Sequence, residues 1–308
     1  MLAHECGHQS FSPWKSVNDF FGLILHSLLL VPYHSWRITH GIHHRRTNHM
    51  QGDQVFVPAK IGKVEGMMMM MMMERGVERK WEVLWESLCE SPIGELGGVI
   101  RMLTLGWPAY LMVNAAGQSY EGVDKRKLNH FHPQAPMFKE SEFWDIVVSD
   151  VGLGVVISGL VLCGKWFGWW NLVYYYAVPY LLVNMWLVLI TYLQHSDPRI
   201  PHYDEKEWTF IRGALCSVDR DYGIYNLLHH HIGDTHVAHH LFSKMPFYHA
   251  QEATECIKKV LGKYYMSDNT PIVKALFRSW RECKFVDESD GPVMFYKNRK
   301  MVQEKKVE

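Results

Sequence analysis

The sequence predicts an all-α membrane protein: a polytopic helical bundle with a cytosolic helical cap that carries three clusters of histidine. Three observations lead to this expectation. The chain of 308 residues contains long apolar runs, and aromatic residues, with 12 Trp among them, make up 13% of it, which is typical of membrane helices with interfacial aromatic belts. The mean hydropathy is nonetheless only −0.15, so a large part of the chain should lie in water.

Two consecutive runs are expected to span a membrane: residues 151–170 (VGLGVVISGLVLCGKWFGWW) and 172–193 (LVYYYAVPYLLVNMWLVLITYL). Each is close to the ~20 residues that cross a hydrocarbon core. The link between them allows only a tight turn, so the spans form a hairpin that returns the chain to its starting side. Everything before residue 145 and after residue 195 is then expected on one face of the membrane.

Two weaker apolar runs are expected to be re-entrant or interfacial helices. Residues 20–31 are only about a dozen and contain His26, and residues 99–116 contain Arg101, Gly106 and Pro108, all of which are poor features for a span.

The stretch EGMMMMMMMERG lies in a low-complexity, Met-rich segment, residues 64–90, that is expected to be an insertion. As a helix, its Met run would cover ~10 Å, which is too short to cross a membrane. No repeat or linker divides the rest, so residues 1–308 are expected to form a single domain.

Charge and cysteine content argue against several classes of function. The formal net charge is zero and the isoelectric point lies near 7.3, which gives no support for binding nucleic acid. The six cysteines show no C-x-x-C pair and no regular spacing, so neither a disulfide framework nor a thiolate zinc site is indicated. The unusual number is the count of 19 histidines.

Three histidine clusters predict a metal centre. On a helix, positions i, i+3 and i+4 lie within roughly 100° of one another, so each cluster presents its imidazoles on one face, while adjacent histidines diverge enough to reach two different ions. Eight such ligands suit two metals with about four each, and imidazole suits iron, zinc, copper or nickel. The clusters are HECGH with His4 and His8, HGIHH with His40, His43 and His44, and HVAHH with His236, His239 and His240.

The remaining isolated histidines are expected in surface or hydrogen-bonded structural roles. The three histidine clusters, in contrast, all fall on the same predicted side of the membrane, which histidines placed by chance along the chain would not do. The isolated residues are His26, His34, His49, His130, His132, His202 and His249.

Six sequence motifs contain or accompany the clusters: VPYHSWRITHGIHH, DQVFVP, GWPAYL, LVLITYLQH, VDRDYG and DTHVAHHLFSKMPFYHA. With these motifs and the clusters, the chain resembles the membrane fatty-acyl desaturase family, and within it the microsomal oleate (delta-12, omega-6) branch. The resemblance runs from residue 2 to about residue 298. It departs in two places: residues 64–90 match poorly, and the first two membrane helices of the family have no counterpart. The chain is therefore expected to be N-terminally truncated, and inactive or nearly so.

The resemblance implies a di-iron centre that activates O2, takes electrons from a separate cytochrome b5 and its reductase, and inserts a cis double bond into the oleoyl chain of a lipid. It also implies a multi-pass protein of the endoplasmic reticulum membrane, with the C-terminus and the three histidine clusters in the cytosol; these clusters are called boxes 1, 2 and 3 in chain order. Lys305 and Lys306 resemble a dilysine retrieval signal. Four carboxylates near the boxes or in matched words could orient imidazole N–H groups or be solvated loop residues: Asp53, Asp219, Asp221 and Asp234.

A ninth imidazole ligand is predicted, because eight histidines shared between two irons leave little margin once positions for O2 stay open. His195 directly follows the second span, where a helix end is a rigid mount at the right depth. His230 lies six residues before the third box. Position favours His195.

Three alternatives stay open. The same boxes serve related enzymes that hydroxylate, conjugate or desaturate at the omega-3 position. HECGH also matches H-E-x-x-H, the zinc protease signature, in which Glu5 would be the general base and the other six box histidines would have no role. The chain could also be an inactive fragment.

Overall fold

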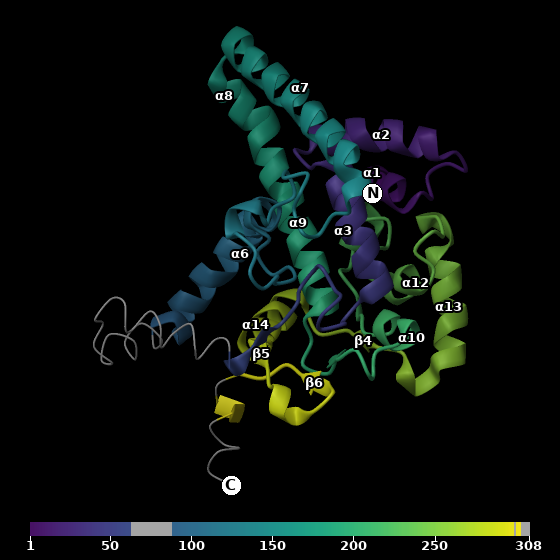
Figure 1. Ribbon diagram of the computed structural model, residues 1–308. Helices are drawn as coiled ribbons and strands as arrows, with labels where there is room; N and C mark the ends of the chain where they lie inside the picture. The colour runs from purple at the N-terminus through teal and green to yellow at the C-terminus, as the bar shows by residue number, and fades with distance from the viewer. Residues whose placement is uncertain (63–87, 299, 303–308) are drawn as a thin grey trace.

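The computed structural model describes residues 1–62, 88–298 and 300–302, and this part of the chain is mostly helical (Figure 1). Most of the low-complexity segment, residues 64–90, and the pair Lys305 and Lys306 lie outside the described residues. The expectations for them stay predictions.

The first three helices form one packed unit: α1 (Leu2–His8), α2 (Lys15–Leu28) and α3 (Tyr33–Arg46). The chain bends by 105° between α2 and α3. One side of α2 exposes large apolar side chains, among them Phe20 at 61% and Ile24 at 42%. An amphipathic helix of this kind suits the membrane interface, as the sequence predicted for residues 20–31.

Both predicted spans are found as helices of one hairpin, which rises at the top of Figure 1. The first arm is α7 (Phe143–Phe167), and the second consists of α8 (Trp169–Leu172), a π-helical turn (Val173–Ala177) and α9 (Val178–His195). Gly168 forms the turn with φ +91°, a conformation that suits glycine.

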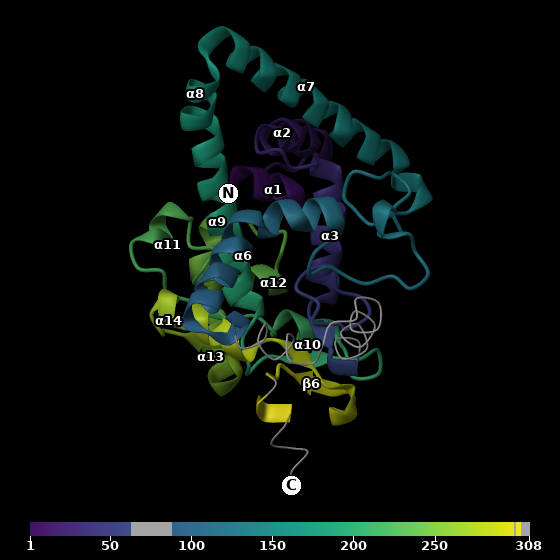
Figure 2. The ribbon, with the colours of Figure 1, turned by 90° about the vertical axis from the view of Figure 1, so that its left-hand side faces the viewer.

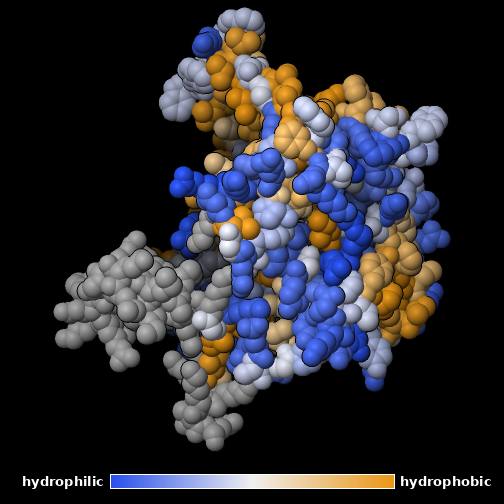
Figure 3. Space-filling view, in the orientation of Figure 1, coloured by the Kyte–Doolittle hydropathy of each residue, from blue (hydrophilic) through white to orange (hydrophobic). Residues whose placement is uncertain are grey.

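Apolar side chains cover the hairpin (Figure 3), and many of them are exposed, such as Val155 at 67% and Leu182 at 51%. Such a surface suits lipid contact. Figure 2 shows α1 and α2 beneath the turn, between the two arms, and α2 and α3 pack against α7.

Most of the segment expected as an interfacial run, residues 99–116, lies in a helix that begins earlier, α6 (Pro92–Val113). Its start is well defined, because the Ser91 side chain accepts a hydrogen bond from Gly94 N and Pro92 occupies the first turn. Pro108 lies inside the helix without ending it. By length and composition α6 is a third candidate span in the described part of the chain.

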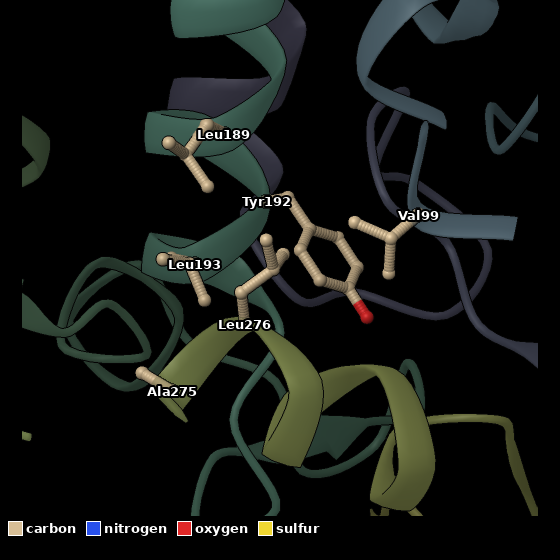
Figure 4. Packing of buried hydrophobic residues seen from close by; sticks show 6 residues of the cluster. All are labelled: Val99, Leu189, Tyr192, Leu193, Ala275 and Leu276. Atoms are coloured by element: carbon tan, nitrogen blue, oxygen red, sulfur yellow. The ribbon is translucent and has the colours of Figure 1, made fainter. Parts of the chain in front are cut away.

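A buried apolar cluster fixes the last turns of α9 (Figure 4). It joins α9 to α6 and to α14 (Ile272–Glu282). Tyr192 and Leu193 point into this cluster, so packing holds the end of the helix from which His195 projects. The cluster consists of Val99, Leu189, Tyr192, Leu193, Ala275 and Leu276.

The rest is a cap of short elements, and its strands depart from the all-α prediction. These strands are two or three residues long and join segments far apart in sequence: β1 (Ala59–Lys60) is parallel to β5 (Phe285–Val286), β2 (Pro201–Tyr203) is antiparallel to β6 (Val293–Phe295), and β3 (Asp219–Arg220) is parallel to β4 (Ser267–Asp268). The cap helices are α10 (Phe210–Ala214), α11 (Tyr225–Leu228), α12 (His236–Leu241) and α13 (Ala250–Leu261). Single 3-10 turns are Lys125–Lys127, Glu140–Glu142, Phe247–His249, Gly262–Tyr264 and Glu288–Asp290.

Candidate metal centre

The first two histidine boxes meet because α1 packs closely on α3. His4 and His8 lie one turn apart on α1, with Gly7 between them. A Cβ atom at Gly7 would come within 2.3 Å of the Trp36 ring, and Trp36 stacks on His40 with ring centroids 4.5 Å apart. The glycine of HECGH therefore allows box 1 to approach box 2.

A first group of imidazoles takes residues from all three boxes. The ligand atoms of His4, His8, His40 and His239 all lie within 4.8 Å of one another. Nε2 of His40 is 2.9 Å from Nε2 of His8 and 3.2 Å from Nε2 of His4. The His239 ring from α12 lies 4.8 Å from the His4 ring and 4.6 Å from the His8 ring, measured between centroids. These side chains converge on one point.

A second group forms around His195, the predicted ninth ligand. The ligand atoms of His43, His195 and His240 lie within 4.8 Å of one another, and all three residues are buried. Nε2 of His236 is 3.0 Å from Nε2 of His195 and 3.0 Å from Nε2 of His240. His236 therefore contacts two of the three members, and we count it with this group as a fourth imidazole.

His44 connects the two groups. Its Nε2 is 3.2 Å from Nε2 of His40 in the first group, and its ring stacks on His240 of the second group at 4.1 Å. The eight box histidines and His195 thus lie in or beside two neighbouring groups, which is the arrangement that two metal ions would need.

The protonation state of these imidazoles fits metal binding. Burial, followed by the neighbouring imidazoles, holds the pKa of His4 and of His8 well below the usual range, and the same causes act on His236 and His240. Burial lowers the pKa of His239 to about 3. These rings are therefore neutral at pH 7, which is the form that binds metal. The all-nitrogen donor set fits iron, and equally zinc, copper or nickel.

Two polar side chains orient the second group. Nδ1 of His43 donates to Asp53 Oδ1 at 2.7 Å, the contact that the sequence allowed for Asp53. Thr47 Oγ1 donates to the His43 carbonyl at 2.7 Å and lies 3.0 Å from Nδ1 of His240. Since that hydroxyl proton is already used, Thr47 accepts from His240 Nδ1–H. Both rings then present an unprotonated Nε2 to the group.

Sequence reasoning did not identify Thr47. Its position, four residues after His43, is a usable signal, because a threonine hydroxyl in a helix often bonds to the carbonyl one turn earlier. Its contact with His240 could not be found this way.

The other three carboxylates bind elsewhere. Asp219 accepts a hydrogen bond from the backbone N of Val237 at 2.8 Å, so it contacts the helix that carries box 3 instead of an imidazole N–H. Asp221 accepts from the Gly223 backbone in a surface loop. Asp234 lies 3.0 Å from Nδ1 of His231, which is outside the boxes.

The second candidate for the ninth ligand, His230, lies outside both groups. Its side chain is exposed and its ring lies 4.9 Å from that of Phe247. It lines a small cavity together with Glu5 and His239, so it lies near the first group without belonging to it.

Glu5 does not have the surroundings of a protease general base. It is 3% exposed, and its Oε2 accepts hydrogen bonds from Ser10 Oγ at 3.0 Å and from Phe247 N at 3.3 Å. The carboxylate thus ties α1 to the turn that follows box 3. Its role here is structural.

Three of the isolated histidines have structural hydrogen bonds, as expected. His26 bonds to the Gly22 carbonyl, His49 to Glu205 and His130 to Thr39. The expectation is wrong for His202, which is 2% exposed and has no hydrogen-bond partner among the described residues at either ring nitrogen, because it packs against the Tyr296 ring instead.

Known proteins confirm the resemblance seen in the sequence. The family model "Fatty acid desaturase" matches residues 1–271. The chain is 50% identical over 298 residues to the Delta(12) fatty acid desaturase of Mortierella alpina, covering 96% of this chain and 73% of that protein. It is 45% identical over 303 residues to the omega-6 fatty acid desaturase, endoplasmic reticulum isozyme 1, of Glycine max, covering 97% and 73%. It is 40% identical over 331 aligned residues to an oleate hydroxylase of Claviceps purpurea, covering 100% and 67%. The chain belongs to the fatty acid desaturase family and is an oxidoreductase of that family.

Proposed function

We propose that this protein is a di-iron, O2-dependent acyl-lipid desaturase that inserts a cis double bond at the delta-12 position of oleoyl chains, in unsaturated fatty acid biosynthesis. The observation that carries the proposal is the pair of neighbouring all-imidazole groups, together with relatives named delta-12 and omega-6 desaturases. Two hydrogens leave a CH2–CH2 pair, and O2 takes them together with two electrons and two protons to form two waters. Bound iron would supply the activation of O2.

The histidines of this chain would serve as the iron ligands, and their surroundings favour the neutral imidazole with an unprotonated Nε2. The first ion would be held by His4, His8, His40 and His239, and the second by His43, His195, His236 and His240, with His44 between them. Asp53 and Thr47 keep the protons of two of these rings on Nδ1, so that Nε2 stays available to metal. Burial lowers the pKa of five box histidines and keeps them neutral: His4, His8, His236, His239 and His240.

The two groups also limit the membrane topology. Boxes 1, 2 and 3 contribute to the same groups, so they belong on one side of the membrane. Between boxes 2 and 3 the chain must then cross an even number of times. In the described part of this stretch the hairpin of α7 and α9 supplies two crossings, which favours a position for α6 at the interface or as a re-entrant helix. Since boxes 1 and 2 flank α2, the bent pair α2 and α3 is re-entrant by the same reasoning.

The location and the partners follow from this topology and from the relatives. The boxes and the C-terminus belong on the cytosolic face of the endoplasmic reticulum membrane, the compartment in the names of the Glycine max relatives. The electron donor is cytochrome b5 with its reductase, and the substrate is an oleoyl phospholipid that enters from the bilayer.

The second candidate function is hydroxylation of the oleoyl chain. It is favoured by the 40% identity with the oleate hydroxylase of Claviceps purpurea. Omega-3 desaturation is the other alternative on the same scaffold.

Expression of the full-length protein in yeast that makes no linoleate tests the proposal. Linoleate should accumulate, and His43→Gln in the same protein should abolish it. The matched control is His249→Gln, since that side chain is 57% exposed. The 308-residue chain, expressed in parallel, tests the separate expectation that it is inactive or nearly so. A hydroxylated product would favour the second candidate, an omega-3 product would change the regiochemistry, and zinc with peptidase activity would reject the class. Membrane-inserted protein with neither product nor iron would contradict the proposed function.

A further inference from the structure

Strand β3 lies between the helices that carry His195 and His236, and it contacts both. Its residue Arg220 is completely buried, at 0% exposure. Arg220 Nε donates a hydrogen bond to the Leu193 carbonyl at 2.8 Å, and Nη2 donates to Asp197 Oδ2 at 2.8 Å. These acceptors lie two residues before and two residues after His195. The guanidinium therefore brackets the position from which that imidazole projects.

The same strand caps the C-terminal end of α9. The last four carbonyls of a helix have no partner within it. Here Val218 N donates to the Gln194 carbonyl at 3.1 Å, next to the contact between Arg220 and the Leu193 carbonyl. A charged donor makes the stronger kind of hydrogen bond, and a cation suits the negative end of the helix dipole. Strand β3 and the residue before it thus hold the end of α9, Val218 through its backbone and Arg220 through its side chain.

The other side of β3 holds the start of α12. Asp219 Oδ1 accepts a hydrogen bond from Val237 N at 2.8 Å, one residue after His236, and the other carboxylate oxygen accepts the Tyr265 hydroxyl. Arg220 N donates to the Gly233 carbonyl at 2.9 Å, just before the same helix. A carboxylate at the first N–H groups of a helix is a favourable cap.

The charge of Arg220 is compensated inside the protein. Asp197 is also 0% exposed and Asp268 pairs with the other end of the guanidinium, while Arg199 binds Asp197 from the solvent side at 2.8 Å. A buried ion pair is weak evidence for stability, because apolar residues of similar volume often do as well. What an apolar residue could not supply is the directed hydrogen bond to the Leu193 carbonyl.

We infer that Asp219 and Arg220 are positioning residues, and that β3 is a clamp that sets the separation of His195 and His236, whose Nε2 atoms lie 3.0 Å apart. The inference rests on the proposed function, since both imidazoles are taken to hold one metal. Metal–ligand distances tolerate only about ±0.2 Å. A small shift of α9 against α12 would therefore remove one ligand from the second group and leave the first group intact.

Two variants test the clamp: Arg220→Lys and Arg199→Lys. Each is made in the full chain, purified from membranes and loaded with 57Fe. Lysine keeps the charge at position 220 but lacks the planar fork that reaches a carbonyl and two carboxylates together. Arg199→Lys is the matched control, because it makes the same change in the same ion-pair network at a side chain that is 48% exposed. Iron per chain and the Mössbauer spectrum are the measurements.

Arg220→Lys should halve the iron content, from about two per chain to about one, with loss of one of two Mössbauer signals, while Arg199→Lys keeps both. Full iron with unchanged resistance to chelator in Arg220→Lys would overturn the clamp, and so would an equal loss in Arg199→Lys. If Arg220→Lys fails to accumulate in membranes, Asp219→Asn decides: one iron should exchange several-fold faster than in the wild type, and unchanged exchange overturns the clamp. A wild-type chain without iron would contradict the proposed function itself.

Discussion

Replacing Asp53 by Asn should weaken metal binding at the second histidine group and leave the first group unchanged. Asp53 Oδ1 accepts from Nδ1 of His43 at 2.7 Å, and Oδ2 accepts from Asn48 N at 2.8 Å. The His43 and Asp53 side chains are only 3% and 4% exposed, so water cannot replace either contact. Oδ1 also accepts from Gln54 N at 2.7 Å and from Val55 N at 3.1 Å. Asparagine keeps the shape but offers one neutral oxygen to these four donors, so its NH2 group would face either the His43 side or Asn48 N. Any hydrogen bond that it keeps to His43 is no longer charge-assisted.

The size of the effect follows from this geometry. Loss of a carboxylate that orients a metal-bound histidine typically costs about 10–100-fold in metal affinity, which corresponds to about 1.4–2.8 kcal/mol. The residue is buried and its bonds are short, so we expect the upper half of this range. Only the second group should respond, because Asp53 contacts His43 and His43 belongs to that group.

The assay is competition with a chelator on purified, iron-loaded protein, with the iron retained per chain measured against chelator concentration. Asp53→Asn should release one iron at about 10–100-fold lower chelator concentration than the wild type, in a separate step. The control is Asp221→Asn, since Asp221 is exposed and binds the Gly223 backbone in a surface loop. An Asp53→Asn protein with the chelator resistance of the wild type would refute the reasoning.

Three further outcomes are expected. Thr47→Val keeps the side-chain shape but leaves His240 Nδ1–H without its acceptor, so the same chelator assay should show a loss of about 1–3 kcal/mol. Burial lowers the pKa of His130 to about 4 and that of His202 to about 3. Between these pKa values and about 6.5, the pKa of a histidine in the unfolded chain, the unfolded chain binds more protons than the folded one. Each residue should therefore cost about 2 kcal/mol of stability as the pH falls from 7 to 5. Melting in detergent should show this loss, and His130→Gln and His202→Gln should each reduce it. Chelation of the metal at pH 7 should lower the melting temperature, since free metal at 100 times its Kd stabilises the folded state by about 2.7 kcal/mol; an unchanged melting curve would argue against a metal in the histidine groups.

Features that depend on local sequence could be predicted, because local physics decides them. The spans follow from the length of two apolar runs, and helices cover both runs. The place of His195 at a helix end led to its prediction as a ligand. Its ring lies in the second group, and the ligand role itself stays a prediction. The turn between the spans was expected near residue 171 and lies at Gly168, since glycine at φ +91° marks the position more sharply than hydropathy does.

Features that depend on contacts between distant segments could not be predicted. The periodicity of a helix puts His40, His43 and His44 on one face, yet it does not say that His40 joins the first group and His43 the second. Thr47 meets His240 across 193 residues of sequence. Such pairs are set by how α3 and α12 pack, and no spacing within either helix encodes that.

The division of the boxes makes the two groups unequal. Box 1 contributes only to the first group, and two members of that group, His4 and His40, are partly exposed. Every member of the second group is buried, and its rings are held by Asp53, Thr47 and the end of α9. Solvent and chelator therefore reach the first group more easily, whereas the second depends on the packing of three helices. A metal in the first group should exchange faster, and damage to the packing should show first as loss from the second.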